Sequence, residues 1–189
     1  MVLILYKNLF NFLKQNNYVD TINNILWNNN IELKPNISFY RIKSLTSIKN
    51  KMKKYNFKNY DDIEDLLGIR YIYLNEEHVE QSINYIKNTF KNKNTNTNTN
   101  TYPFSIIKNK DYILNPKPNG YKAYHICMKL INNNNNINNN NINNNNINNR
   151  LIKLNYISIE IQILSMTMYL YNLEGPPKLY YKNKYNDII

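Results

Sequence analysis

The stretch Ile157-Ser-Ile-Glu-Ile-Gln-Ile-Leu164 decides the fold class of this 189-residue chain. Isoleucines at 157, 159, 161 and 163 alternate strictly with polar residues at 158, 160 and 162. A period of two is typical of a β-strand, because successive side chains point to opposite faces of a sheet. The pattern predicts a strand within 151–164, with Glu160 and Gln162 on its polar face.

Upstream segments predict the strands that pair with it. Residues 69–74 (IRYIYL) indicate a buried strand, 104–107 a short one, and 121–131 a strand rich in β-branched and aromatic residues. The segment 115–120 (NPKPNG) is dense in turn-forming residues. Helical spacing of apolar residues predicts helices within 2–27, from about 43 to 55 and over 76–90, and acidic residues open a short predicted helix over 61–67. We therefore expect an α+β fold with a mixed or antiparallel sheet.

Two asparagine-rich tracts, 92–101 and 132–149, interrupt this pattern. Neither has an apolar face that could offset the entropy of ordering, so we expect disordered insertions. The second tract separates two predicted strands, and a swollen hairpin loop is tolerated because loop-closure entropy grows slowly with length. We expect an N-terminal helical segment over 1–38, one folded domain over 39–182 and a tail over 183–189.

Composition and charge limit the classes of function that this chain can have. The chain has 24 Lys and Arg against 13 Asp and Glu, a net charge of +11, which favours an anionic partner such as nucleotide phosphate, nucleic acid or an acidic membrane. A codon bias toward A and T explains the same lysine excess. One cysteine excludes an intrachain disulfide, and two histidines leave too few ligands for the usual zinc site. No run reaches the roughly 18 apolar residues of a membrane span, so we expect a cytoplasmic protein, with an organelle as the alternative.

Glu160 stands in the middle of an isoleucine ladder, where burying an unpaired charge costs several kcal/mol. It either faces water on an open sheet face or takes part in chemistry. Tyr121, Ala123 and His125 share one face of the neighbouring predicted strand. If the two polar faces coincide, a carboxylate, an imidazole and an aromatic ring meet on one surface.

Asp65 precedes the predicted strand at 69–74, and its carboxylate could hold a metal there together with Glu160. Carboxylates from two strands are a common arrangement for Mg²⁺ in phosphoryl transfer. An ordinary acidic helix start is the alternative, and the nearby carboxylates that compete with Asp65 are Asp61, Asp62 and Glu64.

Cations concentrate between residues 41 and 54, interleaved with hydroxyls at 44, 46 and 47. Such a cluster can bind polyphosphate, and an arginine in it can stack on a base. A solvated charged helix face explains the same residues. Similarly, 115–121 (NPKPNGY) is also compatible with a simple hairpin turn.

Together and in this order, four segments resemble the synthetase domain of the RelA/SpoT family. They are 41–52 (RIKSLTSIKNKM), 65–70 (DLLGIR), 111–125 (DYILNPKPNGYKAYH) and 159–163 (IEIQI). The resemblance covers roughly 39–182 once the asparagine tracts are set aside. Because we recognise no hydrolase or regulatory domain pattern, the chain is similar to the small alarmone synthetases.

The resemblance implies a nucleotidyltransferase-like fold and transfer of the β,γ-diphosphate of ATP to the 3′-hydroxyl of GDP or GTP, with release of AMP. It implies that Arg41 and Arg70 sandwich adenine. Asp65 and Glu160 would bind Mg²⁺, Glu160 would also act as general base, and Tyr121 would stack on guanine. The remaining implied contacts are Lys43, Ser47 and Lys51 on the ATP phosphates, and Lys110, Lys117, Asn119, His125 and Gln162 around the acceptor nucleotide.

Departures from the family pattern cluster after Glu160. Leu164 replaces a usual arginine, and Gly175-Pro-Pro177 follows a helix that lacks the usual histidine. Two alternatives therefore stay open: diphosphate transfer to the 3′ end of tRNA, and nucleotide binding without catalysis. The family also implies a homo-oligomer and no membrane partner.

Overall fold

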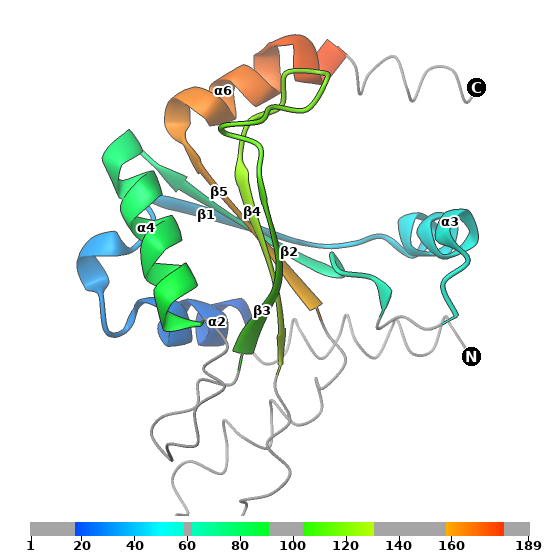
Figure 1. Ribbon diagram of the computed structural model, residues 1–189, viewed down its shortest axis with the longest axis horizontal. Helices are drawn as coiled ribbons and strands as arrows, with labels where there is room; N and C mark the ends of the chain where they lie inside the picture. Colours follow the sequence, from blue (N-terminus) through cyan, green and yellow to red (C-terminus); the bar gives the residue numbers. More distant parts are fainter. Residues whose placement is uncertain (1–17, 59–61, 91–103, 131–157, 180–189) are drawn as a thin grey trace, which may run out of the picture.

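The computed structural model describes residues 18–58, 62–90, 104–130 and 158–179. These residues form a five-stranded sheet in the order β1-β2-β5-β4-β3 (Figure 1). Strands β2 and β5 run parallel, and the other neighbouring pairs run antiparallel. The predicted α+β class is thus confirmed, with a mixed sheet. The strands are β1 (Ile37–Ile42), β2 (Leu67–Tyr73), β3 (Phe104–Asp111), β4 (Tyr124–Leu130) and β5 (Ser158–Ser165).

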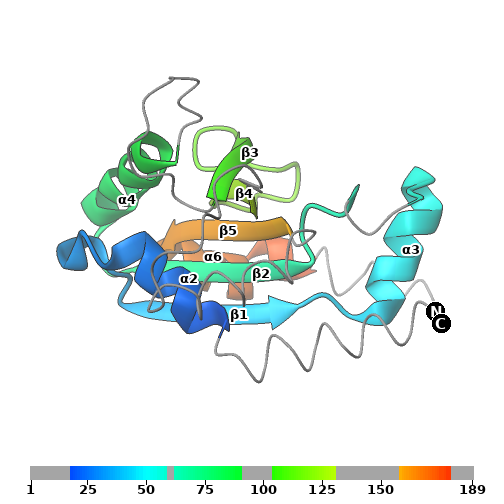
Figure 2. The same ribbon diagram turned by 90° about the horizontal axis from the view of Figure 1, so that it is seen from below.

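The helices occupy three places around the sheet. Helix α2 and helix α4 lie side by side along one face, and α6 follows β5 and lies beside the loop between β3 and β4 (Figures 1 and 2). Helix α3 stands apart, at the end of the sheet where β1 ends and β2 begins. The helices are α2 (Tyr18–Trp27), the 3₁₀ turn η1 (Ile31–Leu33), α3 (Leu45–Tyr55), α4 (Glu76–Thr89) and α6 (Met166–Glu174).

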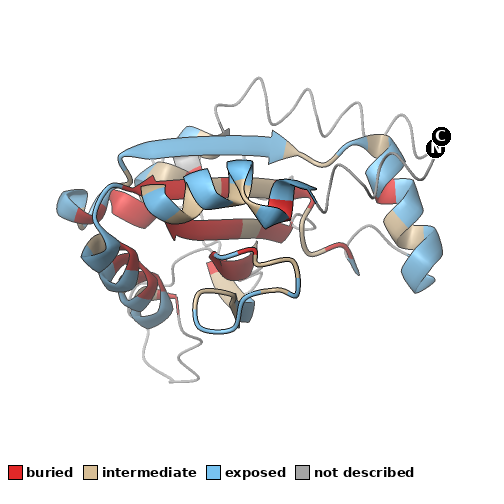
Figure 3. Cartoon of the chain, turned by 90° about the horizontal axis from the view of Figure 1, so that it is seen from above, coloured by how far each residue is buried: buried red, intermediate tan, exposed pale blue. Residues whose placement is uncertain are grey.

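The main core lies between the sheet and the pair α2 and α4. The alternating isoleucines of β5 that the sequence predicts to be buried are at most 1% exposed. The central one, Ile161, is aligned with Ile69 on β2 and Ile126 on β4, which belong to the same apolar cluster. Figure 3 shows buried residues along β2 and β5 and an exposed edge strand β1. Burial of this face fixes the strand register, because a slip by one residue would turn it to solvent.

The opposite face carries the polar residues. Glu160 is aligned with Gly68 on β2 and with Cys127 on β4, and Gln162 is aligned with Arg70 and His125. Directly paired residues point to the same side of a sheet. The polar faces of β4 and β5 therefore coincide.

Several predicted boundaries need correction. Residues 62–66 form turns and not the expected acidic helix, and β2 begins at Leu67. Strand β1 lies where the sequence predicts no strand. β3 extends four residues beyond the expected end at 107, and β4 begins at Tyr124 because 121–123 still belong to the preceding loop. Helix α6 ends at Glu174 before the two prolines, as expected.

Some predictions lie outside the described residues. They concern the helix expected within 2–17, the two asparagine-rich insertions, Asp61, residues 151–157 and the tail. Within the described part of the chain, no helix is both long enough and apolar enough to span a bilayer.

Candidate active site

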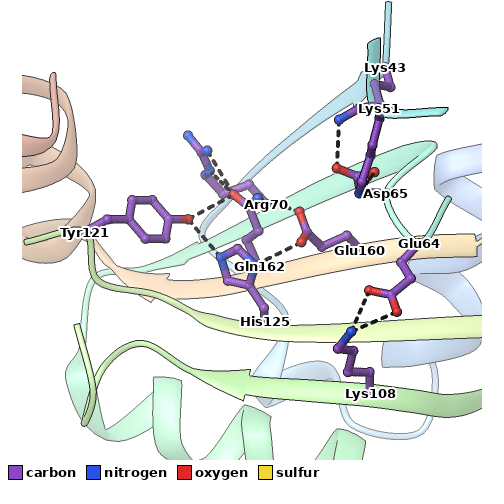
Figure 4. Close-up of polar contacts among 10 residues, drawn as sticks. All are labelled: Lys43, Lys51, Glu64, Asp65, Arg70, Lys108, Tyr121, His125, Glu160 and Gln162. Atoms are coloured by element: carbon purple, nitrogen blue, oxygen red, sulfur yellow. Dashed lines mark hydrogen bonds and ion pairs between the residues drawn. The ribbon is translucent and has the colours of Figure 1, made fainter. Parts of the chain in front are cut away.

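The polar face of β4 and β5 holds a continuous hydrogen-bonded cluster (Figure 4). Glu160 Oε1 lies 3.0 Å from His125 Nδ1, and Glu160 Oε2 accepts a hydrogen bond from Gln162 Nε2 at 2.9 Å. The Tyr121 hydroxyl lies 3.0 Å from His125 Nε2. The carboxylate, imidazole and aromatic ring that the sequence places on separate strands are therefore in contact.

Electrostatics keep Glu160 ionised. Burial alone would raise the pKa of its carboxyl, but the hydrogen bond and charge of His125, the hydrogen bond from Gln162 and the charge of Arg41 lower that pKa to about 2. An ionised carboxylate can only accept hydrogen bonds, so His125 Nδ1 is the donor. In the neutral imidazole, Nε2 then accepts from the Tyr121 hydroxyl. This assignment follows from the network, since hydrogens are not observed.

Gln162 connects this cluster to Arg70 on β2. Its Oε1 accepts hydrogen bonds from Arg70 Nε and Nη2 at 3.0 and 2.9 Å, while its amide nitrogen donates to Glu160. Gln162 is buried, and its orientation is fixed because each end has a partner of the required polarity. One amide thus joins the arginine expected on the ATP side to the carboxylate expected to act on the acceptor.

A second cluster surrounds Asp65 in the turn before β2. Lys43 Nζ lies 2.7 Å from Asp65 Oδ2, and Lys51 Nζ lies 2.9 Å from Oδ1. Partial burial would raise the pKa of Asp65, but the hydrogen bonds and charges of the two lysines lower it. Helix α3 places Lys51 there, and this helix begins where the Ser44 hydroxyl accepts from the backbone N–H of Ser47.

The loop before β4 forms the third part of the site. Lys117 Nζ lies 4.5 Å from the ring centroids of both Tyr112 and Tyr121. Burial lowers the pKa of Lys117, attraction by Glu160 opposes this, and repulsion by Lys110 adds to it. Asn119 Oδ1 accepts from the backbone N–H of Tyr121 at 3.2 Å.

Helix α6 holds this loop in place. Asn172 exchanges two hydrogen bonds with the backbone of Lys122, at 3.0 and 2.7 Å. Gly120 adopts a φ of +81°, and a Cβ there would lie 3.0 Å from the Tyr171 hydroxyl. A glycine is needed at this point both for the backbone conformation and for the close approach of α6.

The remaining predicted residues lie on or near the same face. Arg41 on β1 is aligned with Gly68 and is exposed, and Lys110 on β3 is aligned with His125. The Ser47 hydroxyl accepts a hydrogen bond from the Ser44 hydroxyl at 2.9 Å. The Asp65 and Glu160 clusters share no described contact, although both lie near the starts of the parallel strands β2 and β5.

The competing carboxylates differ from Asp65. Glu64 pairs with Lys108 at 2.9 Å, and both side chains are more than a third exposed. Asp62 is exposed. Asp65 is the carboxylate of this described turn that two lysines hold against the sheet.

The sequence pattern does not single out three aromatic residues that lie at this site. Tyr112 contacts the His125 ring edge-on, with centroids 5.0 Å apart. Phe39 and Tyr169 stack on each other at 5.9 Å, and Arg70 lies over the Tyr169 ring. In a chain with 18 tyrosines, none of these positions stands out by composition.

Cys127 lies on the same face as Glu160, but it is buried and unpaired. Burial, together with the negative charges of Glu160 and Glu64, raises the pKa of its thiol to about 12. The thiol is therefore protonated at neutral pH and a poor nucleophile.

Comparison with known proteins agrees with this geometry. The family model described as the region found in RelA / SpoT proteins matches residues 40–186. The chain belongs to the RelA/SpoT family.

Individual relatives support this assignment. The chain is 28% identical over 148 residues to the GTP pyrophosphokinase YwaC of Bacillus subtilis, a match that covers 75% of this chain and 56% of that protein. The chain therefore spans little more than half the length of that curated relative. Among solved structures, it resembles small alarmone synthetase 2 from Bacillus subtilis with a TM-score of 0.62 and 26% identity, over 95% of this chain and 82% of that one.

Two more distant structures share the fold. A GTP pyrophosphokinase family protein from Streptococcus pneumoniae has a TM-score of 0.62 at 19% identity, over 98% of this chain and 79% of that one. Small alarmone synthetase 1 from Bacillus subtilis, bound to its product pppGpp, has a TM-score of 0.54 at 16% identity, over 79% of this chain and 64% of that one. The predicted nucleotidyltransferase-like fold of small alarmone synthetases is confirmed.

The departure at Leu164 has a structural explanation. Its side chain is 1% exposed and belongs to a small apolar cluster with Ile72, Tyr121 and Ala123, against which α6 residues pack. An arginine at this place would bury a charge in apolar surroundings, which is costly unless it is paired. In this chain, leucine is compatible with the way α6 covers the sheet.

Proposed function

We propose that this RelA/SpoT family member is a (p)ppGpp synthetase that transfers the β,γ-diphosphate of ATP to the 3′-hydroxyl of GDP or GTP and releases AMP. The observation that carries the proposal is the ionised Glu160, which lies on the same sheet face as Arg70 and is connected to Arg70 through Gln162 and to Tyr121 through His125. The named activity of the relative YwaC, GTP pyrophosphokinase, supports the same reaction class.

On the ATP side, Lys43 and Lys51 would bind the phosphates. Lys43 and Lys51 neutralise Asp65 in the free protein, and phosphate oxygens can take over these ammonium groups. Arg41 and Arg70 project from neighbouring strands on the same face, and guanidinium planes on both sides of adenine would stack on it. Positioning and charge neutralisation are the main tasks in phosphoryl transfer.

On the acceptor side, the loop 115–121 supplies the contacts. Tyr121 would stack on guanine, with Lys117, Asn119 and the amide of Gln162 near the base. In the free protein Tyr121 is only 8% exposed, and Lys117 lies over its ring. Stacking of guanine on the ring face that Lys117 covers would require this ammonium group to move.

The residues present fit Mg²⁺. The described residues contain no group of three or more His, Cys, Asp or Glu side chains that could hold a metal alone, and Mg²⁺ commonly binds through one or two carboxylates plus substrate phosphates. Asp65 and Glu160 are ionised and would hold it. When bound, the ion would neutralise charge that develops on the phosphate oxygens.

Glu160 would accept the proton of the 3′-hydroxyl. Both of its oxygens already accept a hydrogen bond, which is why its pKa is about 2 and its proton affinity is low. The 3′-hydroxyl would take the place of Gln162 Nε2 as donor to Oε2, and its proton would pass to this oxygen as the hydroxyl oxygen bonds to the β-phosphorus of ATP and the bond to AMP breaks. His125, hydrogen-bonded to the other oxygen, would hold the carboxylate in place during the transfer.

Glu160→Gln tests this role. The amide keeps the size of the side chain but removes the proton acceptor, so AMP formation with GDP or GTP should fall about 100-fold or more, while ATP affinity changes only a few-fold. Glu64→Gln is the matched control, because Glu64 is a surface carboxylate paired with Lys108; its turnover should equal that of the wild type. Unchanged turnover in Glu160→Gln would reject the assigned role.

A second candidate is diphosphate transfer to the 3′ end of tRNA. The net charge of +11 favours it, as do the exposed lysines of α3, which are Lys49, Lys53 and Lys54. A nucleotide-binding protein without turnover is the third candidate, because Leu164 and the region after it depart from the family. Retention of both carboxylates favours catalysis, since a protein that only binds nucleotides has little need of a general base.

A further inference from the structure

The Arg70 guanidinium is held from two sides by different elements. Its edge donates two hydrogen bonds to Gln162 Oε1 on β5. Its Cζ also lies over the ring of Tyr169 on α6, 5.7 Å from the ring centroid, a cation–π contact. Contacts from two different elements thus restrict the position of the group.

Tyr169 is itself held by contacts within the protein. Its ring stacks on Phe39 of β1, with centroids 5.9 Å apart and an angle of 24° between the planes. It also packs against the small apolar cluster that contains Ile72 and Leu164. Tyr169 thus connects α6 to both β1 and the sheet face beneath it.

We infer that Tyr169 is a positioning residue for the ATP half of the site, which acts through Arg70 and does not itself touch the nucleotide. The inference rests on the proposed function, because it takes Arg70 as a contact of adenine. A free arginine side chain loses considerable rotamer entropy when it is ordered by a ligand. Tyr169 orders it in advance, so that ATP binding does not bear this cost.

The test measures binding of a non-hydrolysable ATP analogue, AMPCPP, by isothermal titration calorimetry on the full chain. Tyr169→Leu removes the ring but keeps an apolar side chain, and we expect about three- to tenfold weaker AMPCPP binding, the scale of a partly exposed cation–π contact. Affinity for GDP should stay within twofold. Tyr169→Phe keeps the ring and should bind AMPCPP like the wild type.

Tyr171→Leu is the matched control on the same helix. Its ring lies against Gly120 and Gly175 and not against Arg70, so AMPCPP affinity should not change. Equal weakening of AMPCPP and GDP binding by Tyr169→Leu would indicate a merely structural role and overturn the inference. So would an equal loss of AMPCPP affinity in Tyr171→Leu.

A double-mutant cycle tests whether Tyr169 affects ATP binding through Arg70. In an Arg70→Ala background, Tyr169→Leu should cause no further loss of AMPCPP affinity, because the group it positions is gone. Additive losses would overturn the inference, as would a wild-type protein that does not bind AMPCPP. If the cycle shows coupling but no diphosphate reaches GDP or GTP, the proposed function fails and the positioning role stands.

Discussion

At the scale of single residues, the site depends on how two carboxylates avoid being buried unpaired. Glu160 receives two hydrogen bonds on the sheet face, and Asp65 receives two lysines at the edge of the sheet. Both carboxyls have lowered pKa values and so are ionised at neutral pH. Perturbed pKa values of this kind are frequent at functional sites.

This arrangement predicts a pH dependence of stability. The pKa of Glu160 falls from an ordinary value of 4.5 to about 2 on folding. The contribution of ionised Glu160 to the free energy of unfolding is therefore complete above about pH 4.5 and is lost as the pH falls toward 2. The difference in free energy of unfolding between wild type and Glu160→Gln, measured by urea denaturation at pH 6, 4 and 3, should shrink over that range. A difference independent of pH would contradict the low pKa.

At the scale of elements, the loop 115–121 connects α6 to the active face through Gly120. Gly120→Ala places a Cβ at a φ of +81° and 3.0 Å from the Tyr171 hydroxyl. We expect a loss of about 1–3 kcal/mol in the free energy of unfolding. Relative to the wild type, the KM for GDP should rise more than the KM for ATP. Gly68→Ala is the control for stability, because its Cβ would make only an ordinary contact with Arg41 at 3.5 Å. Equal destabilisation by the two substitutions would contradict the role of the turn.

The length of the connection between β4 and β5 gives a second prediction at this scale. The antiparallel pairing extends to Lys129 and Ser158, so a much shorter loop could join the same strands. Deleting 132–149 removes about two thirds of the connection and changes its closure entropy by only about 1 kcal/mol. Thermal unfolding and turnover of the deletion variant should both stay near those of the wild type. A collapse of the melting temperature would show that this segment supports the fold.

Elements with a buried face could be predicted from the sequence, and those without one could not. The isoleucine alternation of β5 and the apolar run of β2 reflect burial directly. β1 has an exposed or half-exposed residue at every position, so its sequence carries no alternation that predicts a strand. The acidic helix expected near Asp65 is a turn because its carboxylates pair with lysines from other elements, a tertiary effect outside local propensity.

The candidate site was predictable where the family motifs lie and not where α6 packs. Resemblance located the carboxylates, the lysines and Tyr121, but neither Tyr169 nor Phe39 belongs to a motif. Their importance comes from contacts between β1, β2 and α6, segments far apart in the chain. Such contacts leave no local signal in one sequence.

At the scale of the whole molecule, the positive charge is compatible with two acceptors of the diphosphate, a guanosine nucleotide and the 3′ end of tRNA. Binding of tRNA releases counterions in proportion to the phosphates neutralised, so its affinity should fall steeply between 50 and 200 mM salt. A mononucleotide neutralises few phosphates, and we expect the KM for GDP to change far less. Comparing the salt dependence of binding for GDP and for tRNA distinguishes these modes. A steep slope for both ligands would indicate that general charge attraction dominates.

The most direct test of the proposed reaction follows the transferred group. Purified protein is incubated with Mg²⁺, γ-labelled ATP and GDP, GTP or deacylated tRNA, and both the position of the label and the release of AMP are measured. We expect the label on the guanosine nucleotide, with one AMP formed for each transfer. Label on tRNA, or no transfer despite measurable nucleotide binding, would contradict the proposed reaction.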